Sequence, residues 1–338
     1  MITLPTTHED VMVGVPDGVA APTLGDLIDN HLHMPFPFQR NPYESEVAAG
    51  VDAWLSAWGL TDEPGVAAMI VRTRPAELAS CTSPTVDSGL LQIVADQIAY
   101  QFVFDDRAED IGRHSPGRLL PMLGESVAIL RDGQPPSTPL GAALADLHRK
   151  VRERCTPGQA ARWAWKSREY VHGLLYEAVA QAQPFLMRTG DCTSIRSLTA
   201  GVEPFHPLCE AAQPHELSPA ELHHPVVRRL SRLSADAAVW IPDLFSAVKE
   251  QRAGEMINLA LAYQREHECS LPAAVLMAIQ RINGTIEELQ SLYAEFKPEL
   301  SPAGVGYVEG MIGWIRGCYQ WSRTVPRYGD VALVSAAP

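Results

Sequence analysis

The sequence predicts an all-α fold in a single domain. Long segments carry an apolar residue every three or four positions, which is the period of a helix with one buried face. Alternating strand-like runs with Asn-Gly or Asp-Gly turns are nearly absent, and Pro and Gly interrupt the periodic segments where helices would end. We therefore expect roughly ten or more helices, most of them ended by these breakers.

The order of the segments divides the chain into an arm, a helical domain and a tail. The first thirty or so residues are rich in Pro, Gly, Thr and Asp and show no periodicity, so we expect residues 1–33 to be a loosely ordered arm. Residues 34–330 would form the domain, and residues 331–338 a C-terminal tail. The helices expected within the domain are "SGLLQIVADQIAYQFVF", "PLGAALADLHRKVRERC", "AARWAWKSREYVHGLLYEAVAQA", "GEMINLALAYQREHE", "LPAAVLMAIQRINGTIEELQSLYAEF" and "GVGYVEGMIGWIRGCYQWSR".

Composition excludes several classes of partner. The 338 residues include 27 basic and 40 acidic side chains, a net charge of -13, and no run rich in Lys or Arg, which argues against nucleic acid or an anionic membrane. An anionic substrate would have to be met by a few basic side chains or by metal ions on acidic ligands. The absence of a basic start before an apolar core, and of any long apolar run, indicates a cytoplasmic protein. Six scattered cysteines without a CxxC suggest neither a zinc cage nor disulfides.

An acidic cluster closes the first of these predicted helices. In "FVFDDRAED", Asp105, Asp106, Glu109 and Asp110 lie along one broad helical stripe, where they would repel one another unless solvated or bound to a cation. A charged helix end is the simpler interpretation, but the cluster follows an apolar, aromatic segment and would lie at the mouth of something hydrophobic. Mg²⁺ commonly binds one or two carboxylates together with substrate phosphates. The cluster therefore suits a substrate with a diphosphate head and a hydrocarbon tail.

A second set of oxygen ligands occurs in "WIPDLFSAVKE". Ser246 and Glu250 share one side of a helix with position 242, and Asp243 lies one residue further on. Hydroxyl and carboxylate oxygens again suit Mg²⁺, and Lys249 could point at an anion. Position 242 itself is a proline, which has no side-chain oxygen.

Together the two segments resemble the motifs of bacterial class I terpene synthases, an aspartate-rich DDxxD-like segment and an ND-x-x-S-x-x-x-KE segment. "SIRSLTAG" resembles the segment that carries the family's diphosphate-sensing Arg, and Arg196 precedes position 242 by the family's usual separation. "WIRGCYQWSRTVPRY" resembles the final helix with its Arg-Tyr pair, and "NPYESEVAAGVDAWLSAWGL" the opening helix. The resemblance spans about residues 35–328, and several motifs in the right order are more specific than any one of them.

The resemblance implies a fold and a metal site. The fold would be antiparallel helices around a deep apolar cavity, with the two motifs facing each other across its mouth. Three Mg²⁺ ions would be expected there. Asp105 would be the main ligand of the first motif, with Asp106 behind it and Asp110 as its final acid, and Ser246 and Glu250 would be the ligands of the second motif.

The resemblance also implies how a substrate is held. It implies a terpene cyclase that acts on a linear isoprenoid diphosphate, with farnesyl diphosphate as first candidate and geranylgeranyl diphosphate as second, and it is compatible with a homodimer. The residues that would grip the diphosphate are Arg196, Lys249, Arg327 and Tyr328. Thr199 and Ala200 fall where the family couples diphosphate sensing to ionisation.

The carbocation left by the departing diphosphate needs unreactive walls, and aromatic faces supply them through cation–π attraction. Phe102, Phe205 and Trp314 stand where relatives present cavity-lining aromatics, and Trp321 is a further candidate. An aromatic residue at helical spacing is equally compatible with ordinary core packing.

Pro242 leaves two questions open. An active enzyme could fill the vacant ligand position with water or with Asp243, whereas an impaired relative would bind isoprenoid diphosphates without turning them over. A prenyl-chain-elongating synthase is disfavoured, because its second motif would be aspartate-rich. Since proline lacks the amide hydrogen and clashes with the preceding turn, we also expect a bend or a helix start near Ile241.

Overall fold

The computed structural model describes residues 23–63, 65–113, 115–182 and 188–328, and this part of the chain contains helices and no β-strand. The all-α prediction is confirmed, and each segment expected to be helical contains a helix. The α-helices are α2 (Leu24–His31), α3 (Glu44–Ala57), α4 (Val66–Thr73), α5 (Pro75–Thr82), α6 (Ser88–Gly112), α7 (Leu120–Asp132), α8 (Pro139–Arg154), α9 (Pro157–Ala182), α10 (Thr189–Thr199), α11 (His206–Ala211), α12 (Pro219–Leu222), α13 (Pro225–Ala253), α14 (Leu259–His267), α15 (Leu271–Phe296) and α16 (Pro302–Thr324). Short 3₁₀ turns are η1 (Leu60–Asp62), η2 (Pro116–Leu119), η3 (Glu203–Phe205) and η4 (Lys297–Glu299).

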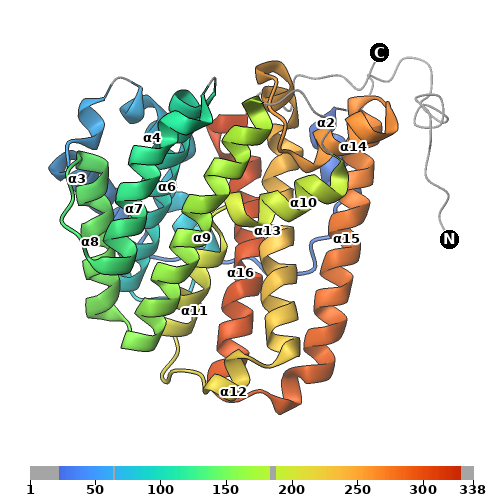
Figure 1. The fold of residues 1–338 in the computed structure, drawn as a ribbon. Helices are drawn as coiled ribbons and strands as arrows, with labels where there is room; N and C mark the ends of the chain where they lie inside the picture. Colours follow the sequence, from blue (N-terminus) through green and yellow to red (C-terminus); the bar gives the residue numbers. More distant parts are fainter. Residues whose placement is uncertain (1–22, 64, 114, 183–187, 329–338) are drawn as a thin grey trace.

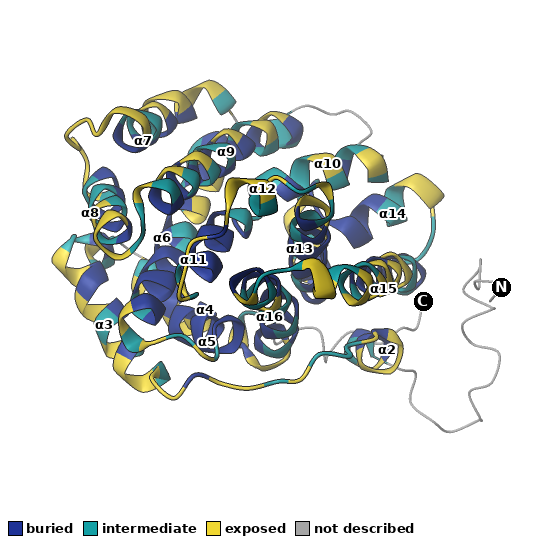
Figure 2. Ribbon diagram, turned by 90° about the horizontal axis from the view of Figure 1, so that it is seen from below, coloured by how far each residue is buried: buried dark blue, intermediate teal, exposed yellow. Residues whose placement is uncertain are grey.

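Long helices form a bundle in which α13 and α16 lie side by side near the centre (Figure 1). α13 also packs against α15, α16 against α5, and α9 against α10 and α7. Figure 2 shows that the buried residues lie on the inward sides of the helices and the exposed residues on the outer rim. This distribution is what the periodicity of the sequence predicts, because an apolar stripe on each helix is removed from water by its neighbours.

The prediction that residues 1–33 form a loosely ordered arm is wrong near the end of this range, because α2 forms at Leu24–His31. Thr23 caps the helix and exchanges hydrogen bonds with Asp26 in a capping box, and Leu24, Leu27 and Ile28 are buried. Asp29 on α2 accepts hydrogen bonds from Tyr319 and Arg323 of α16 at 3.1 and 2.6 Å. A short helix with three buried apolar side chains is thus attached to the domain. The remainder of the expected arm, residues 1–22, and the expected tail, residues 331–338, lie outside the described residues.

α13 runs without interruption through Pro242. A helix start at this position is therefore wrong, and the bend near Ile241 stays a prediction. His224 caps the helix at its first turn, and Gly254, with φ +73°, ends it in the left-handed conformation that glycine adopts most readily. Among the described residues, no helix combines the length and the apolar character that crossing a membrane requires.

Candidate functional site

A pocket of about 210 Å³ lies between α6, α9, α10, α13 and α16. It collects almost every residue singled out in the sequence, although these residues are spread over more than two hundred positions. The predicted site residues that line it are Phe102, Asp105, Asp106, Arg196, Thr199, Ala200, Phe205, Ser246, Lys249, Glu250, Trp314, Trp321, Arg327 and Tyr328. Asp110 is the exception.

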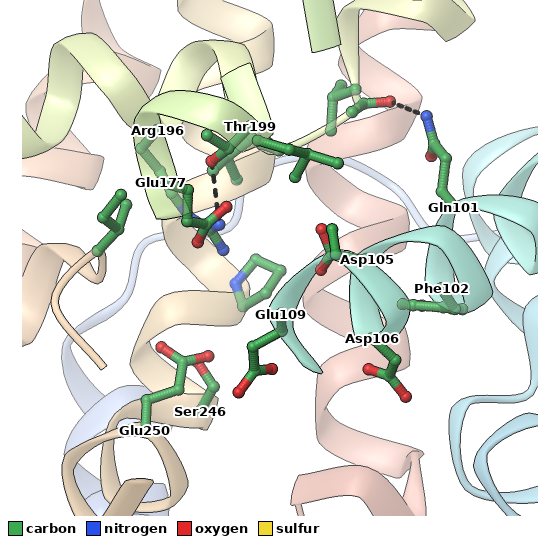
Figure 3. Close-up of a pocket in the computed structure, with 18 of the residues that line it drawn as sticks. Gln101, Phe102, Asp105, Asp106, Glu109, Glu177, Arg196, Thr199, Ser246 and Glu250 are labelled. Carbon is green, nitrogen blue, oxygen red and sulfur yellow. Dashed lines mark hydrogen bonds between the residues drawn. The ribbon is translucent and has the colours of Figure 1, made fainter. Parts of the chain in front are cut away.

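The first acidic motif enters the pocket from the last two turns of α6. Asp105, Asp106 and Glu109 line the pocket, whereas Asp110 does not. Helix geometry explains the difference, because a residue five positions along points about 140° away from Asp105 and a residue four positions along only about 40°. The structure thus brings Glu109, and not Asp110, beside Asp105 and Asp106. Figure 3 shows Glu109 on the side of α6 that faces Ser246 and Glu250.

Ser246 and Glu250 reach the pocket from α13, one helical turn apart. Pro242 lines the pocket in the same row but offers no oxygen from its side chain. Carboxylate and hydroxyl oxygens from α6 and α13 are the donors that Mg²⁺ prefers, so the residues present fit a divalent cation. Among the described residues, no three acidic, histidine or cysteine side chains are grouped closely enough to hold a metal by themselves.

Asp243 does not replace the missing ligand. Its carboxylate is fully buried and both of its oxygens are engaged: Oδ1 accepts from Nε and Nη2 of Arg196 at 3.1 and 2.8 Å, and Oδ2 accepts from the backbone N–H of Leu259 at 2.9 Å. The suggestion that Asp243 fills the vacant coordination position is therefore wrong. Its hydrogen bonds instead connect α10, α13 and the start of α14.

Arg196 is aimed across the pocket from α10. Its guanidinium lies 3.5 Å from the Oγ1 of Thr199, one turn further along α10 (Figure 3). Although burial alone would lower the pKa of Arg196, the carboxylates of Asp243, Glu177 and Glu250 raise it above its ordinary value. The side chain is thus a permanent cation, held in one orientation by Asp243.

α10 ends where the chain must pass close to α6. Gly201, with φ +62°, follows Thr199 and Ala200, and its carbonyl accepts a hydrogen bond from Nε2 of Gln101 at 3.1 Å. The φ of Gly201 lies in the left-handed region that favours glycine, and a Cβ at this position would lie 2.8 Å from that nitrogen and require the Gln101 side chain to move. This contact fixes the end of α10 against α6.

Several carboxyl groups in the pocket have raised pKa values. Loss of solvation inside the pocket raises the pKa of Asp105 to about 6, although Arg196 and Arg327 favour its charged form. Burial, together with the charges of Asp105, Glu255 and Glu250, raises the pKa of Glu177 to about 8. Since desolvated carboxylates that repel one another are stabilised by cations, this electrostatic pattern also fits bound divalent metal.

Aromatic rings form the apolar wall of the pocket. The Phe205 and Trp314 ring centroids are 4.2 Å apart, and those of Phe102 and Trp321 are 5.9 Å apart in a stacked pair. The guanidinium of Arg327 lies 5.4 Å from the Phe102 ring centre. Apolar walls and a charged rim therefore share one pocket.

Three polar residues of the site were missed from the sequence. Glu177 of α9 and Glu255, just after α13, line the pocket, and Asn258 contacts Ser246 and Glu250 from outside it. Glu177 is a lone acid in the apolar run "LLYEAVAQA", which could have marked it. Asn258 precedes the apolar run "LALAY" and carries the signal of a helix cap.

Known proteins resemble this chain in sequence and in fold. A family model described as terpene synthase family 2, C-terminal metal binding, matches residues 96–288. The (-)-alpha-amorphene synthase ((2E,6E)-farnesyl diphosphate cyclizing) of Streptomyces viridochromogenes is 75% identical over 336 residues, which cover 99% of each chain. The (+)-T-muurolol synthase of Roseiflexus castenholzii is 28% identical and covers 88% of this chain and 93% of its own.

The crystal structure of germacradien-4-ol synthase from Streptomyces citricolor superposes with a TM-score of 0.76 over 87% of this chain and 98% of its own, at 23% identity. That likeness supports the fold. A family model that matches more than half of the chain, and a relative 75% identical over nearly its whole length, confirm the resemblance seen in the motifs. The chain belongs to the terpene synthase family.

Proposed function

We propose that this enzyme ionises farnesyl diphosphate and cyclises the resulting carbocation to a sesquiterpene. The observation that carries the proposal is that two facing sets of oxygen donors, the basic side chains of Arg196, Lys249 and Arg327, and an aromatic wall come together in one pocket. The 75% identical relative cyclises farnesyl diphosphate, and so does the relative from Roseiflexus castenholzii. An impaired, non-catalytic protein is not favoured.

Residues at the rim of the pocket would bind metal and diphosphate, and residues of its wall would surround the carbocation. Asp105 and Asp106 on one side, and Ser246 and Glu250 on the other, would hold Mg²⁺, with Glu109 in place of Asp110; three ions is the number we propose. Bound Mg²⁺ would neutralise the charge that develops on the departing diphosphate. Basic side chains would donate hydrogen bonds to the same oxygens as the bond breaks, an effect that is strongest in a site closed to water.

The donors to the diphosphate would be Arg196, Lys249, Arg327 and Tyr328. Arg196 already lies in a fixed orientation, so little reorganisation accompanies its hydrogen bonds. Through the contact of Arg196 with Thr199 and the turn at Ala200, the position of the diphosphate would be coupled to the end of α10.

The aromatic wall would accommodate the carbocation. Phe102, Phe205, Trp314 and Trp321 present faces that attract a cation by about 2 kcal/mol or more when water is excluded, and they carry no strong nucleophile.

We further propose that the enzyme is cytoplasmic. That it forms a homodimer stays a prediction.

Incubation of the purified protein with Mg²⁺ and geranyl, farnesyl or geranylgeranyl diphosphate tests the proposal. We expect farnesyl diphosphate to be turned over fastest, and gas chromatography with mass spectrometry to show a sesquiterpene. The amorphene skeleton is the first reference compound to compare, because the 75% identical relative forms it. Faster turnover of geranylgeranyl diphosphate would contradict the chain length proposed here.

A further inference from the structure

Asn258 is a fully buried amide at the junction of α13 and α14. Its Oδ1 accepts a hydrogen bond from the backbone N–H of Leu261 at 3.1 Å, which makes it the N-cap of α14. Because a carbonyl oxygen must face that N–H, the amino group of the same amide has to point the other way. It points at the second metal motif.

The amino group lies within hydrogen-bonding distance of three oxygens of α13. Nδ2 of Asn258 is 2.7 Å from Oε2 of Glu250, 2.8 Å from the backbone carbonyl of Asp243 and 3.3 Å from Oγ of Ser246. One side chain thus contacts both oxygen-bearing residues of the motif.

The motif needs such support because position 242 contributes nothing. Pro242 has no side-chain oxygen, and the carboxylate of Asp243 is committed to Arg196 and to α14. Ser246 and Glu250 must then hold their cation as a pair. A pair of flexible side chains binds a metal well only if their oxygens are already in place, which is the task of the hydrogen-bonding partners behind the ligands.

We propose that Asn258 is a positioning residue for the second metal motif: its amide fixes Oε2 of Glu250 and Oγ of Ser246, and thereby compensates for the proline at position 242. Asn258 acts through these two residues, because its oxygen is occupied by the cap and its nitrogen can only donate. The inference rests on the proposed function, since it concerns the metal that this function requires.

The test separates the capping role of Asn258 from its positioning role. Asn258→Ser and Asn258→Thr each keep a capping oxygen and lose the amide nitrogen, and two variants are made so that one unfolded protein does not end the test. Ser301→Ala is the matched control, because Ser301 caps α16 through Gly304 and does not line the pocket. The measurement is the Mg²⁺ concentration that half-maximally raises the melting temperature in the presence of inorganic diphosphate.

We expect the Asn258 variants to need about tenfold more Mg²⁺ or more, the usual effect of removing a hydrogen-bonding partner behind a metal ligand. Ser301→Ala should melt earlier with an unchanged Mg²⁺ midpoint. In the Asn258→Ser background, Pro242→Asn should recover part of the Mg²⁺ affinity and Pro242→Ala should not, because only Asn restores a side-chain oxygen.

An unchanged Mg²⁺ midpoint in a folded Asn258 variant would overturn the inference and leave Asn258 as a helix cap alone. Equal effects of Pro242→Asn and Pro242→Ala would also count against it. Turnover of farnesyl diphosphate by the unaltered enzyme is measured in parallel. If that turnover is absent, the proposed function fails; if it is present and the midpoints do not move, the inference about Asn258 fails by itself.

Discussion

At the scale of single residues, the side of the helix decides which acids of the first motif can work together. The sequence places four carboxylates within six residues, but in the last two turns of α6 only Asp105, Asp106 and Glu109 line the pocket, and Asp110 does not. Family spacing suggested Asp110, and helix geometry favours Glu109. The assignment of Glu109 and that of Asp110 to the site predict different effects when Asp110 is mutated.

Asp105→Asn should lower the rate of cyclisation by about a hundredfold or more, because it removes a carboxylate that we propose binds the metal opposite the diphosphate. Asp110→Asn removes the same charge from the same helix on its exposed side and should change the rate by about twofold at most. Initial rates of product formation at saturating Mg²⁺ compare them. Similar losses in both variants would restore Asp110 to the site.

The His206 imidazole gives a second prediction at this scale, on stability. Burial lowers the pKa of His206 to about 4, and its Nδ1 lies 2.8 Å from Oγ of Ser231. The folded state thus favours the neutral ring, whereas in the unfolded chain the pKa is near its ordinary value of 6.5. Stability should be fully present above pH 6.5 and fall as pH drops toward 4, by up to about 3 kcal/mol.

Carboxylates also become protonated in this pH range. The contribution of His206 is therefore obtained as the difference in unfolding free energy between the wild type and a His206 variant. Urea unfolding of the wild type and of His206→Gln is measured between pH 4 and 7. The stability of the variant should depend less steeply on pH than that of the wild type. Parallel profiles would show that His206 contributes nothing to acid sensitivity.

At the scale of elements, α13 is the helix on which the site depends. It carries Ser246, Lys249 and Glu250, and through Asp243 it connects to Arg196 of α10 and to the first turn of α14. It continues through Pro242, where the carbonyl of Ala238 loses the amide hydrogen that it would normally accept. The helix is thus locally weakened in the middle of the site.

Pro242→Ala should restore that hydrogen bond and stabilise the protein by about 1–3 kcal/mol, since an interior proline costs a helix about 3 kcal/mol. Urea unfolding measures the change. A decrease in stability would mean that α13 and its neighbours are already shaped around the proline.

Asp243→Asn should lower the free energy of unfolding by about 3–5 kcal/mol, because it leaves the largely buried guanidinium of Arg196 without its counter-charge. Glu288→Gln is the matched control: it breaks an ion pair with Arg229 in which both side chains are about half exposed, and it should cost less than about 1 kcal/mol. Equal losses in thermal denaturation would contradict a structural role for Asp243.

At the scale of the whole molecule, periodicity was sufficient to predict the helices, and the motifs indicated segments that line one pocket. Periodicity failed to predict a helix where the periodic segment was short. α2 was missed because three buried apolar residues on eight positions do not stand out in a Pro- and Gly-rich stretch. Asn258 and Glu177 were missed because their importance depends on which helices meet, and spacing along one segment contains no information on that.

Pro242 illustrates the same limit. The resemblance implies that a ligand is missing at position 242, but only the packing of α14 against α13 reveals that Asp243 is already paired and that Asn258 reaches both Ser246 and Glu250. Sequence patterns predict each helix by itself. The support that Asn258 gives to Ser246 and Glu250 depends on how two helices pack together.

We propose that this pocket ionises and cyclises farnesyl diphosphate with the help of divalent metal. The most direct measurement follows diphosphate release and volatile product from farnesyl diphosphate with Mg²⁺, and again after addition of excess EDTA. We predict a sesquiterpene and an equivalent amount of diphosphate in the first case and neither in the second. Intact farnesyl diphosphate in the presence of Mg²⁺, or a sesquiterpene formed equally well with EDTA, would contradict the account.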